Sequence, residues 1–220
     1  MRVLVIGSSG GIGGALIAAH GAQGDVVIGL SRRTDGLDIT DEASITRVLG
    51  GLSGGFDRII VATGALELGG TAPEKSLRAL TAPALQAQFA LNAMGPALVL
   101  KHAARLLPRD RPARFAALSA RVGSIGDNGL GGWYAYRAAK AALNQLIHTG
   151  AIELARSHPQ AVVVTLHPGH VATPLSLKYG GALAAVTPEA AAQNLIRVMD
   201  GLTPADSGGF FDWAGKPVPW

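Results

Sequence analysis

The chain has 220 residues, no cysteine and a formal net charge of +4; hydrophobic side chains make up 48% and charged ones 15%. This length and composition suit a globular protein with a sizeable core, and they exclude disulfides and thiolate metal sites. No run approaches the roughly 18 unbroken apolar residues of a membrane span, so we expect a cytoplasmic protein without a membrane partner. The densest basic group, within 105–114, surrounds two prolines, which favours a solvated connection over a nucleic-acid surface.

Short apolar runs predict buried strands, and longer periodic segments predict helices. We expect strands at 3–6, 26–30, 58–61, 115–118, 161–166 and 209–211. We expect helices at 12–19, after a capping Asp41, over 83–107 with an interruption at Gly95-Pro96, over 133–156, and over 188–200 behind a Thr187 cap. Strands alternate with helices, and the continuous apolar strands imply burial on both faces. The sequence therefore predicts one α/β domain over 1–220, with a parallel sheet and helices on both sides.

A glycine-rich turn, residues 7–14, lies between the first predicted strand and the first predicted helix. Glycines let a diphosphate approach the backbone, and the helix N-terminus offers free N–H groups to the phosphates. No Lys-Ser or Lys-Thr follows, which argues against a nucleotide triphosphatase loop. A tight turn without a ligand is the alternative interpretation.

The second predicted strand ends in Ser31, Arg32 and Arg33, without a carboxylate at its tip. In dinucleotide-binding folds an acidic residue here binds the ribose 2′-hydroxyl, whereas arginine accommodates a 2′-phosphate. Arginine also suits phosphate through its planar fork of donors. We therefore expect NADP(H) rather than NAD(H), with a solvated loop pair as the alternative.

Tyr136 and Lys140 lie one helical turn apart and so share a helix face. A free tyrosine has a pKa of about 10, and a nearby ammonium favours the phenolate and lowers that value. The pair could serve as a proton donor and acceptor. Taken alone it is more often an ordinary surface pair, so its interpretation depends on the rest of the chain.

The motifs in this order resemble the short-chain dehydrogenase/reductase family. Gly7-x-x-x-Gly11-x-Gly13 matches its glycine loop, 37–40 is similar to its adenine-contacting segment, and 167–173 resembles the segment that reaches the nicotinamide through Thr173. Residues 131–137 look most like the small C-factor-like and sniffer-like carbonyl reductases. The resemblance implies a Rossmann-type, doubly wound parallel sheet of about seven strands. It also implies NAD(P)H-dependent hydride transfer between a small-molecule carbonyl and its alcohol.

The resemblance also implies a set of site residues. Tyr136 would donate the proton, Lys140 would lower its pKa and hold the nicotinamide ribose, and Asn92 would anchor a water leading to Lys140. Capping or kinking of the long helix is an equally weighted role for Asn92. The implied cofactor contacts are Gly7, Ser9, Gly11, Ile12, Gly13, Ser31, Arg32, Arg33, Asp38, Ile39, Ala62, Gly64, Tyr136, Lys140, Pro168, Gly169, Val171 and Thr173.

Two positions depart from the family pattern. The usual Asn-Asn-Ala-Gly stands here as 61–64, Val-Ala-Thr-Gly, with only the glycine kept. The usual Ser-Ser stands as Ser119-Ala120, so the second hydroxyl is missing. Ser124 precedes Tyr136 by close to the usual interval. We therefore expect Ser124, and less strongly Ser119, to supply the catalytic hydroxyl.

Other features shape the remaining expectations. His167 and His170 have a metal-like spacing, but Pro168 and Gly169 between them break any helical face, so no metal site is expected. The segment 174–186 should cover the substrate. The family's usual interface, through helices 83–107 and 133–156, predicts a homodimer or homotetramer.

A catalytically weak NAD(P)-binding sensor or signalling protein of the same fold is the main alternative function, and a nucleic-acid binder ranks lowest.

Overall fold

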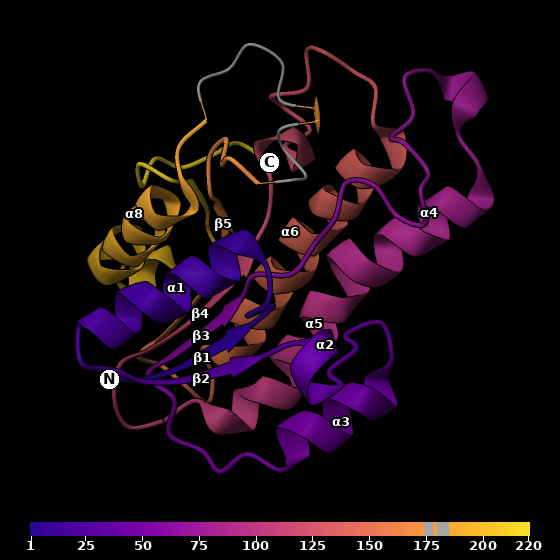
Figure 1. The fold of residues 1–220 in the computed structure, drawn as a ribbon. Helices are drawn as coiled ribbons and strands as arrows, with labels where there is room; N and C mark the ends of the chain where they lie inside the picture. Colours follow the sequence, from indigo (N-terminus) through magenta and orange to yellow (C-terminus); the bar gives the residue numbers. More distant parts are fainter. Residues whose placement is uncertain (174–177, 180–184) are drawn as a thin grey trace.

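The computed structural model describes residues 1–173, 178–179 and 185–220, and its centre is one parallel sheet (Figure 1). The strands are β1 Arg2–Ile6, β2 Val26–Leu30, β3 Arg58–Val61, β4 Ala113–Leu118, β5 Ala161–His167 and β6 Phe210–Asp212. Their order across the sheet is β2-β1-β3-β4-β5-β6, and every neighbouring pair is parallel. All six strands expected from the sequence are confirmed, with small shifts at their ends.

Helices cover both faces of this sheet (Figure 1). The α-helices in the described ranges are α1 Gly11–Ala22, α2 Arg32–Asp35, α3 Glu42–Gly50, α4 Ala82–Phe89, α5 Gly95–Ala103, α6 Tyr134–Leu154 and α8 Pro188–Gly201. Shorter helical turns lie at Leu77–Ala79, Ala90–Met94, Ala104–Leu106, Arg121–Gly123 and Pro204–Asp206. Helices α1 and α8 pack on one face, while α3, α5 and α6 pack on the other (Figure 1). The expected doubly wound arrangement is confirmed.

Successive strand residues point into different cores. Ile59 and Phe115 belong to the cluster under α3, α5 and α6, whereas Ile60 and Ala116 belong to the cluster under α1 and α8. All four are completely buried. Burying one large aliphatic or aromatic side chain stabilises the fold by about 1.5–3 kcal/mol, so strands that are apolar on both faces stabilise both layers.

The sheet has one strand fewer than the expected count of about seven. In the usual doubly wound order 3-2-1-4-5-6 a further strand pairs outside the second one, but here β2 is the edge of the described sheet. A parallel crossover needs a dozen or more residues. Residues 31–41, between β2 and α3, hold only the four-residue helix α2 and a loop, so the connection is too short for another parallel strand.

Two of the expected helix starts are confirmed by their caps. The Asp41 carboxylate accepts a hydrogen bond from the Ala43 N–H at the start of α3. The Thr187 hydroxyl accepts one from the Ala190 N–H at the start of α8. Each cap satisfies a backbone donor that has no partner within its helix.

The long helical stretch predicted at 83–107 is present but changes its hydrogen bonding earlier than expected. A π-helical turn, Ala90–Met94, joins α4 to α5, and Gly95-Pro96 begins the next α-helical segment. Pro96 has no N–H to offer the carbonyl of Asn92, so the regular ladder is interrupted just before it. Turns of this kind often occur at functional sites, and this one carries Asn92.

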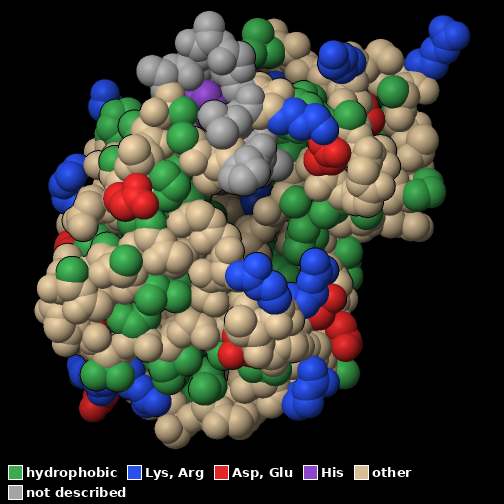
Figure 2. Space-filling model, viewed as in Figure 1, with side chains coloured by type: hydrophobic (Ala, Val, Ile, Leu, Met, Phe, Trp, Pro, Cys, Tyr) green, Lys and Arg blue, Asp and Glu red, His purple; other side chains and the backbone are tan. Residues whose placement is uncertain are grey.

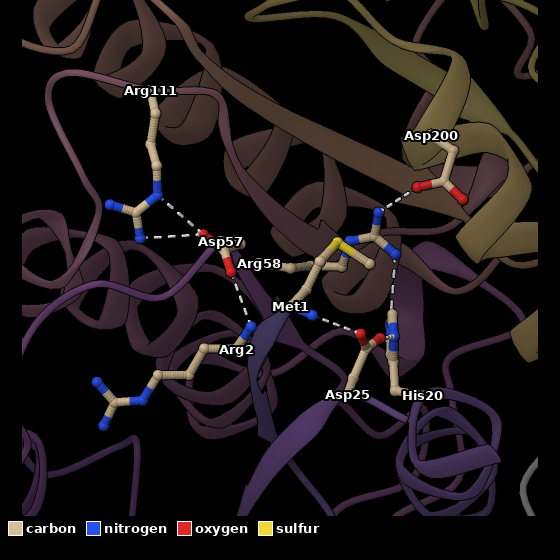
Figure 3. Close-up of polar contacts among 8 residues, drawn as sticks. All are labelled: Met1, Arg2, His20, Asp25, Asp57, Arg58, Arg111 and Asp200. Atoms are coloured by element: carbon tan, nitrogen blue, oxygen red, sulfur yellow. Dashed lines mark hydrogen bonds and ion pairs between the residues drawn. The ribbon is translucent and has the colours of Figure 1, made fainter. Parts of the chain in front are cut away.

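A network of polar and charged side chains lies at the amino ends of the strands, opposite their carboxyl ends (Figure 3). The fully buried Arg58 contacts Asp200 and lies 3.3 Å from His20 Nε2, and His20 Nδ1 lies 2.7 Å from Asp25. The Met1 ammonium donates to the same carboxylate at 2.7 Å. Burial lowers the pKa of His20, although its bond to Asp25 acts in the opposite direction. This network ties β1, α1, β3 and α8 together at the edge away from the candidate site.

None of the helices within the described ranges is long and apolar enough to cross a membrane.

Candidate active site

The glycine loop lies at the point where the sheet order reverses, between β1 and β3. Gly7 has φ +93°, and a Cβ there would come within 2.8 Å of the Ala62 carbonyl group after β3. A Cβ on Gly13 would lie 2.1 Å from the Gly7 carbonyl oxygen, so α1 can start close to the loop only with glycine. Gly10, the residue at the N-cap of α1, makes no side-chain capping bond. The open backbone and helix N-terminus fit the pyrophosphate of a dinucleotide.

The short helix α2 begins directly after the tip of β2. The Ser31 hydroxyl accepts the Thr34 N–H at 3.1 Å and caps α2, so it is engaged within the chain. Arg32 is 79% exposed and lies 3.9 Å from Asp38. Figure 2 shows basic side chains over the region of α2, beside a hollow. Exposed guanidinium groups at this position fit a ribose 2′-phosphate.

Asp38 and Ile39 lie in the loop between α2 and α3 and serve different purposes. Asp38 accepts hydrogen bonds from the Thr40 hydroxyl at 2.7 Å and from the Thr40 N–H at 2.9 Å, which lower the pKa of its carboxyl. Ile39 is buried, and its Cδ1 would lie 2.8 Å from a Cβ on Gly95. The Asp38 carboxylate is thus partly exposed and ionised, whereas Ile39 packs against the long helix.

Tyr136 and Lys140 occupy the first two turns of α6. Lys140 is 2% exposed, and its Nζ donates to the Leu118 carbonyl at 2.9 Å and lies 5.8 Å from the Tyr136 ring centroid. Burial lowers the pKa of Lys140 to about 7 and raises the pKa of Tyr136 to about 12. The expected lowering of the Tyr136 pKa by Lys140 is therefore wrong for this structure, because desolvation disfavours both charged forms.

Asn92 joins the π-helical turn to the loop after β3. It is completely buried; its amide donates to Ala65 O at 2.9 Å, and its Oδ1 accepts the Ala65 N–H at 3.2 Å. A Cβ on Gly64 would lie 2.8 Å from Asn92 Oδ1 and 3.3 Å from Lys140 Nζ. Gly64, the residue kept from the family pattern, thus lets Asn92 and Lys140 approach one another.

The two candidate serines have different surroundings. Ser119, at the end of β4, lines the cavity beside Tyr136, and its buried hydroxyl has no hydrogen-bond partner in the described part of the chain. Ser124 does not line that cavity, and its hydroxyl accepts the Asp127 N–H at 3.1 Å. Ala120 lies on the cavity wall without a hydroxyl. Ser119 thus lines the same cavity as Tyr136, whereas the favoured Ser124 does not.

A cavity of about 740 Å³ brings many of the expected residues together. Those on its wall are Ile12, Ser119, Tyr136, Pro168, Gly169, Val171 and Thr173. A Cβ on Gly11 would lie 3.3 Å from the Thr173 side chain, so the segment after β5 meets the glycine loop. Ser9 lies in the glycine loop but not on this wall. The cavity lies at the carboxyl ends of β4 and β5 and reaches Ile12 in the first turn of α1, at the side of the sheet where doubly wound folds bind their ligands.

The same wall includes residues that sequence reasoning missed or placed elsewhere. Arg121, Asp127, Leu130, Trp133 and Arg137 all line it. In the sequence, only the place of Arg137 directly after Tyr136 could have pointed to it. Burial lowers the pKa of His167, which also lines the cavity, to about 4. Of the expected cover 174–186, Tyr179 reaches this wall, while 174–177 and 180–184 lie outside the described residues.

Comparison with known proteins identifies relatives over most of the chain. Residues 25–206 match the family model described as Enoyl-(Acyl carrier protein) reductase. The chain is 40% identical over 136 residues to C-signal of Myxococcus xanthus, covering 60% of this chain and 76% of that protein. It is 31% identical over 185 residues to 1-hydroxy-2-glutathionyl-2-methyl-3-butene dehydrogenase of Rhodococcus sp. strain AD45, covering 84% and 79%.

Solved structures share the fold at lower identity. The carbonyl reductase Sniffer of D. melanogaster superposes with a TM-score of 0.81 at 19% identity, covering 100% of this chain and 99% of that one. The NADPH-bound carbonyl reductase from chicken fatty liver gives a TM-score of 0.81 at 23% identity, covering 100% and 98%. Together with the family match, these likenesses confirm the resemblance inferred from the motifs. The chain belongs to the short-chain dehydrogenase/reductase family of oxidoreductases.

Proposed function

We propose that residues 1–220 form one domain that binds NADP(H) and interconverts a small carbonyl compound and its alcohol. The observation that carries this proposal is the position of Tyr136, which lies on the wall of a cavity at the carboxyl edge of the sheet with Lys140 buried behind it. The glycine cradle opens at the same edge. The nicotinamide would supply the hydride, and the protein would supply position and the proton.

The state of Tyr136 suits reduction near neutral pH. Because burial raises its pKa to about 12, the phenol is protonated and can donate to the oxygen that gains charge as the carbonyl is reduced. Ser119 can donate its free hydroxyl to the same oxygen. Lys140 is held by Leu118 O close to Asn92 and Gly64, where it can support the ribose side of the site. One hydride and one proton added to the carbonyl give the alcohol.

A catalytically weak sensor is the second candidate, supported by Ala120 at the usual serine position and by the similarity to C-signal. Titration with NADPH and NADH, followed by NADPH oxidation across a panel of aldehydes and ketones, separates the two. Turnover with any member of the panel supports the reductase. Tight NADPH binding without turnover across the panel would favour the sensor.

Replacing both Arg32 and Arg33 with Ala is expected to weaken NADPH binding by at least about 10-fold while leaving NADH binding nearly unchanged. A charge-assisted hydrogen bond to phosphate contributes about 1.5–3 kcal/mol, and only NADPH carries the 2′-phosphate. Fluorescence titration with both nucleotides measures the effect. Equal losses for NADPH and NADH would contradict the assignment. The control is Arg47→Ala, which removes a basic side chain on α3.

The serine variants should separate catalysis from stability. Ser119→Ala is expected to lower turnover by about 10- to 100-fold, because it removes a hydroxyl that has no partner among the described residues and that can donate to the reacting oxygen. Ser124→Ala is expected to cost about 1 kcal/mol of unfolding free energy with little loss of turnover, since its hydroxyl holds the Asp127 N–H. Steady-state rates and urea unfolding of both variants provide the measurement. The opposite pattern would return the catalytic role to Ser124.

A further inference from the structure

The helix that carries Tyr136 has no cap of its own. α6 begins at Tyr134, and the residue before it, Trp133, makes no side-chain capping bond. Trp133 also has φ +52°, a left-handed conformation that side-chain-bearing residues rarely adopt. The first N–H groups of a helix need acceptors when they are buried. Tyr136 lies in this first turn, so whatever fixes the turn also fixes the phenol.

Glu74, from the segment between β3 and α4, supplies the missing acceptors. Its carboxylate Oε2 accepts the Ala135 N–H at 3.3 Å, and its backbone carbonyl accepts the Trp133 N–H at 2.5 Å. Glu74 is only 6% exposed. It also lines a second cavity of about 280 Å³, which has Tyr136 on its wall. The carboxylate therefore lies at the start of α6 and beside the phenol-bearing turn.

We propose that Glu74 is a positioning residue for Tyr136, acting as the N-terminal cap of α6 from a distant part of the chain. This inference rests on the proposed function. The bond to Ala135 N–H is the one that a capping side chain normally makes. A negative charge at a helix N-terminus is favourable, and the Glu74 carbonyl helps to hold the strained backbone of Trp133.

The charge of Glu74 has a second consequence for the reaction. Burial raises the pKa of Tyr136, and a negative charge fixed at the residue before it would act in the same direction, because like charges repel. It therefore helps to keep Tyr136 protonated, as a proton donor must be. An amide at position 74 would keep the capping acceptor and remove this charge.

Two variants separate the cap from the charge. Glu74→Ala removes both and is expected to lower kcat by about 3- to 30-fold with little change in KM, the fold-change that matches a typical cap. Glu74→Gln keeps an acceptor and is expected to recover most of kcat. In Glu74→Gln the alkaline rise of alcohol oxidation should move to lower pH. Glu42→Gln, which changes a first-turn carboxylate on α3, is the matched control and should leave both quantities unchanged.

Each outcome bears on a distinct claim. Wild-type protein without turnover would remove the proposed function and not the cap. An active wild type with unchanged kcat in Glu74→Ala would overturn the positioning role. If Glu74→Ala does not fold, the pH profile of Glu74→Gln decides the matter: a shift to lower pH supports the proposal, and an unshifted profile overturns it, because the carboxylate would then not act on Tyr136.

Discussion

Replacing Tyr136 with Phe is expected to lower carbonyl reduction by about 10²- to 10⁴-fold, the range that a positioned proton donor contributes. The phenyl ring keeps the packing of the first turn of α6, so NADPH binding and unfolding free energy should change little. Steady-state NADPH oxidation, nucleotide titration and urea unfolding measure these three quantities. Turnover that survives in Tyr136→Phe would refute the proposed proton donor.

Tyr134→Phe provides the matched control, since it removes a hydroxyl two residues away on the same helix. The residue one turn after Tyr134 is Ala138, so Tyr134 has no lysine partner. We therefore expect Tyr134→Phe to keep near wild-type turnover. The pH dependence adds a second check. With the pKa of Tyr136 raised to about 12, alcohol oxidation by wild type should rise through the alkaline range, while carbonyl reduction stays flat near neutrality. The rise should be absent in Tyr136→Phe.

Replacing Lys140 with Met is expected to lower turnover by about 10²-fold or more and to raise the free energy of unfolding. Lys140 is 2% exposed, and burial lowers its pKa from 10.5 to about 7. That shift corresponds to about 5 kcal/mol of destabilisation below pH 7. After about 1 kcal/mol for the lost bond to Leu118 O and some relaxation, we expect a gain of about 2–4 kcal/mol near pH 7.

The sign of this effect can be followed with pH. Between about pH 7 and 10.5 the unfolded chain keeps Lys140 protonated while the folded chain does not. Unfolding then takes up a proton, so wild-type stability should rise with pH through this window. Urea unfolding from pH 6 to 10 should show that rise in wild type and a flatter profile in Lys140→Met. Lys101→Met, which removes an exposed ammonium, is the control and should show no such gain.

A gain in unfolding free energy together with a loss of turnover in Lys140→Met would show that this one side chain lowers stability and is needed for catalysis. Buried charged groups are usually kept for function, since an apolar side chain of similar size is cheaper to bury. A Lys140→Met variant that loses both stability and turnover would contradict this account and make Lys140 a structural residue.

Several features of the fold could be predicted from the sequence because they depend on local chemistry. Apolar, β-branched runs form strands wherever both faces are covered, and all six runs became strands. Asp41 and Thr187 cap their helices through bonds to residues two or three positions away. The described sheet has six strands where the family resemblance implied about seven, because the connection between β2 and α3 is too short for another parallel strand.

The site was only partly predictable for the opposite reason. Spacing favoured Ser124, but Ser119, directly after β4, is the serine that lines the same cavity as Tyr136. The π-helical turn at Asn92 depends on Pro96 and on the Ala65 backbone, which is distant in sequence. Glu74 gave no signal in the sequence, because a helix cap from so distant a segment leaves no local pattern.

The sequence alone determined the order of strands and helices, the glycine loop and the one-turn spacing of Tyr136 and Lys140, since these follow from backbone preferences over a few residues. The hydroxyl on the cavity wall, the carboxylate at the start of α6 and the titration of the pair depend instead on contacts between distant segments. Burial raises the pKa of Tyr136 and lowers that of Lys140. Burial is created by atoms from distant segments, and no pattern of neighbouring residues encodes it.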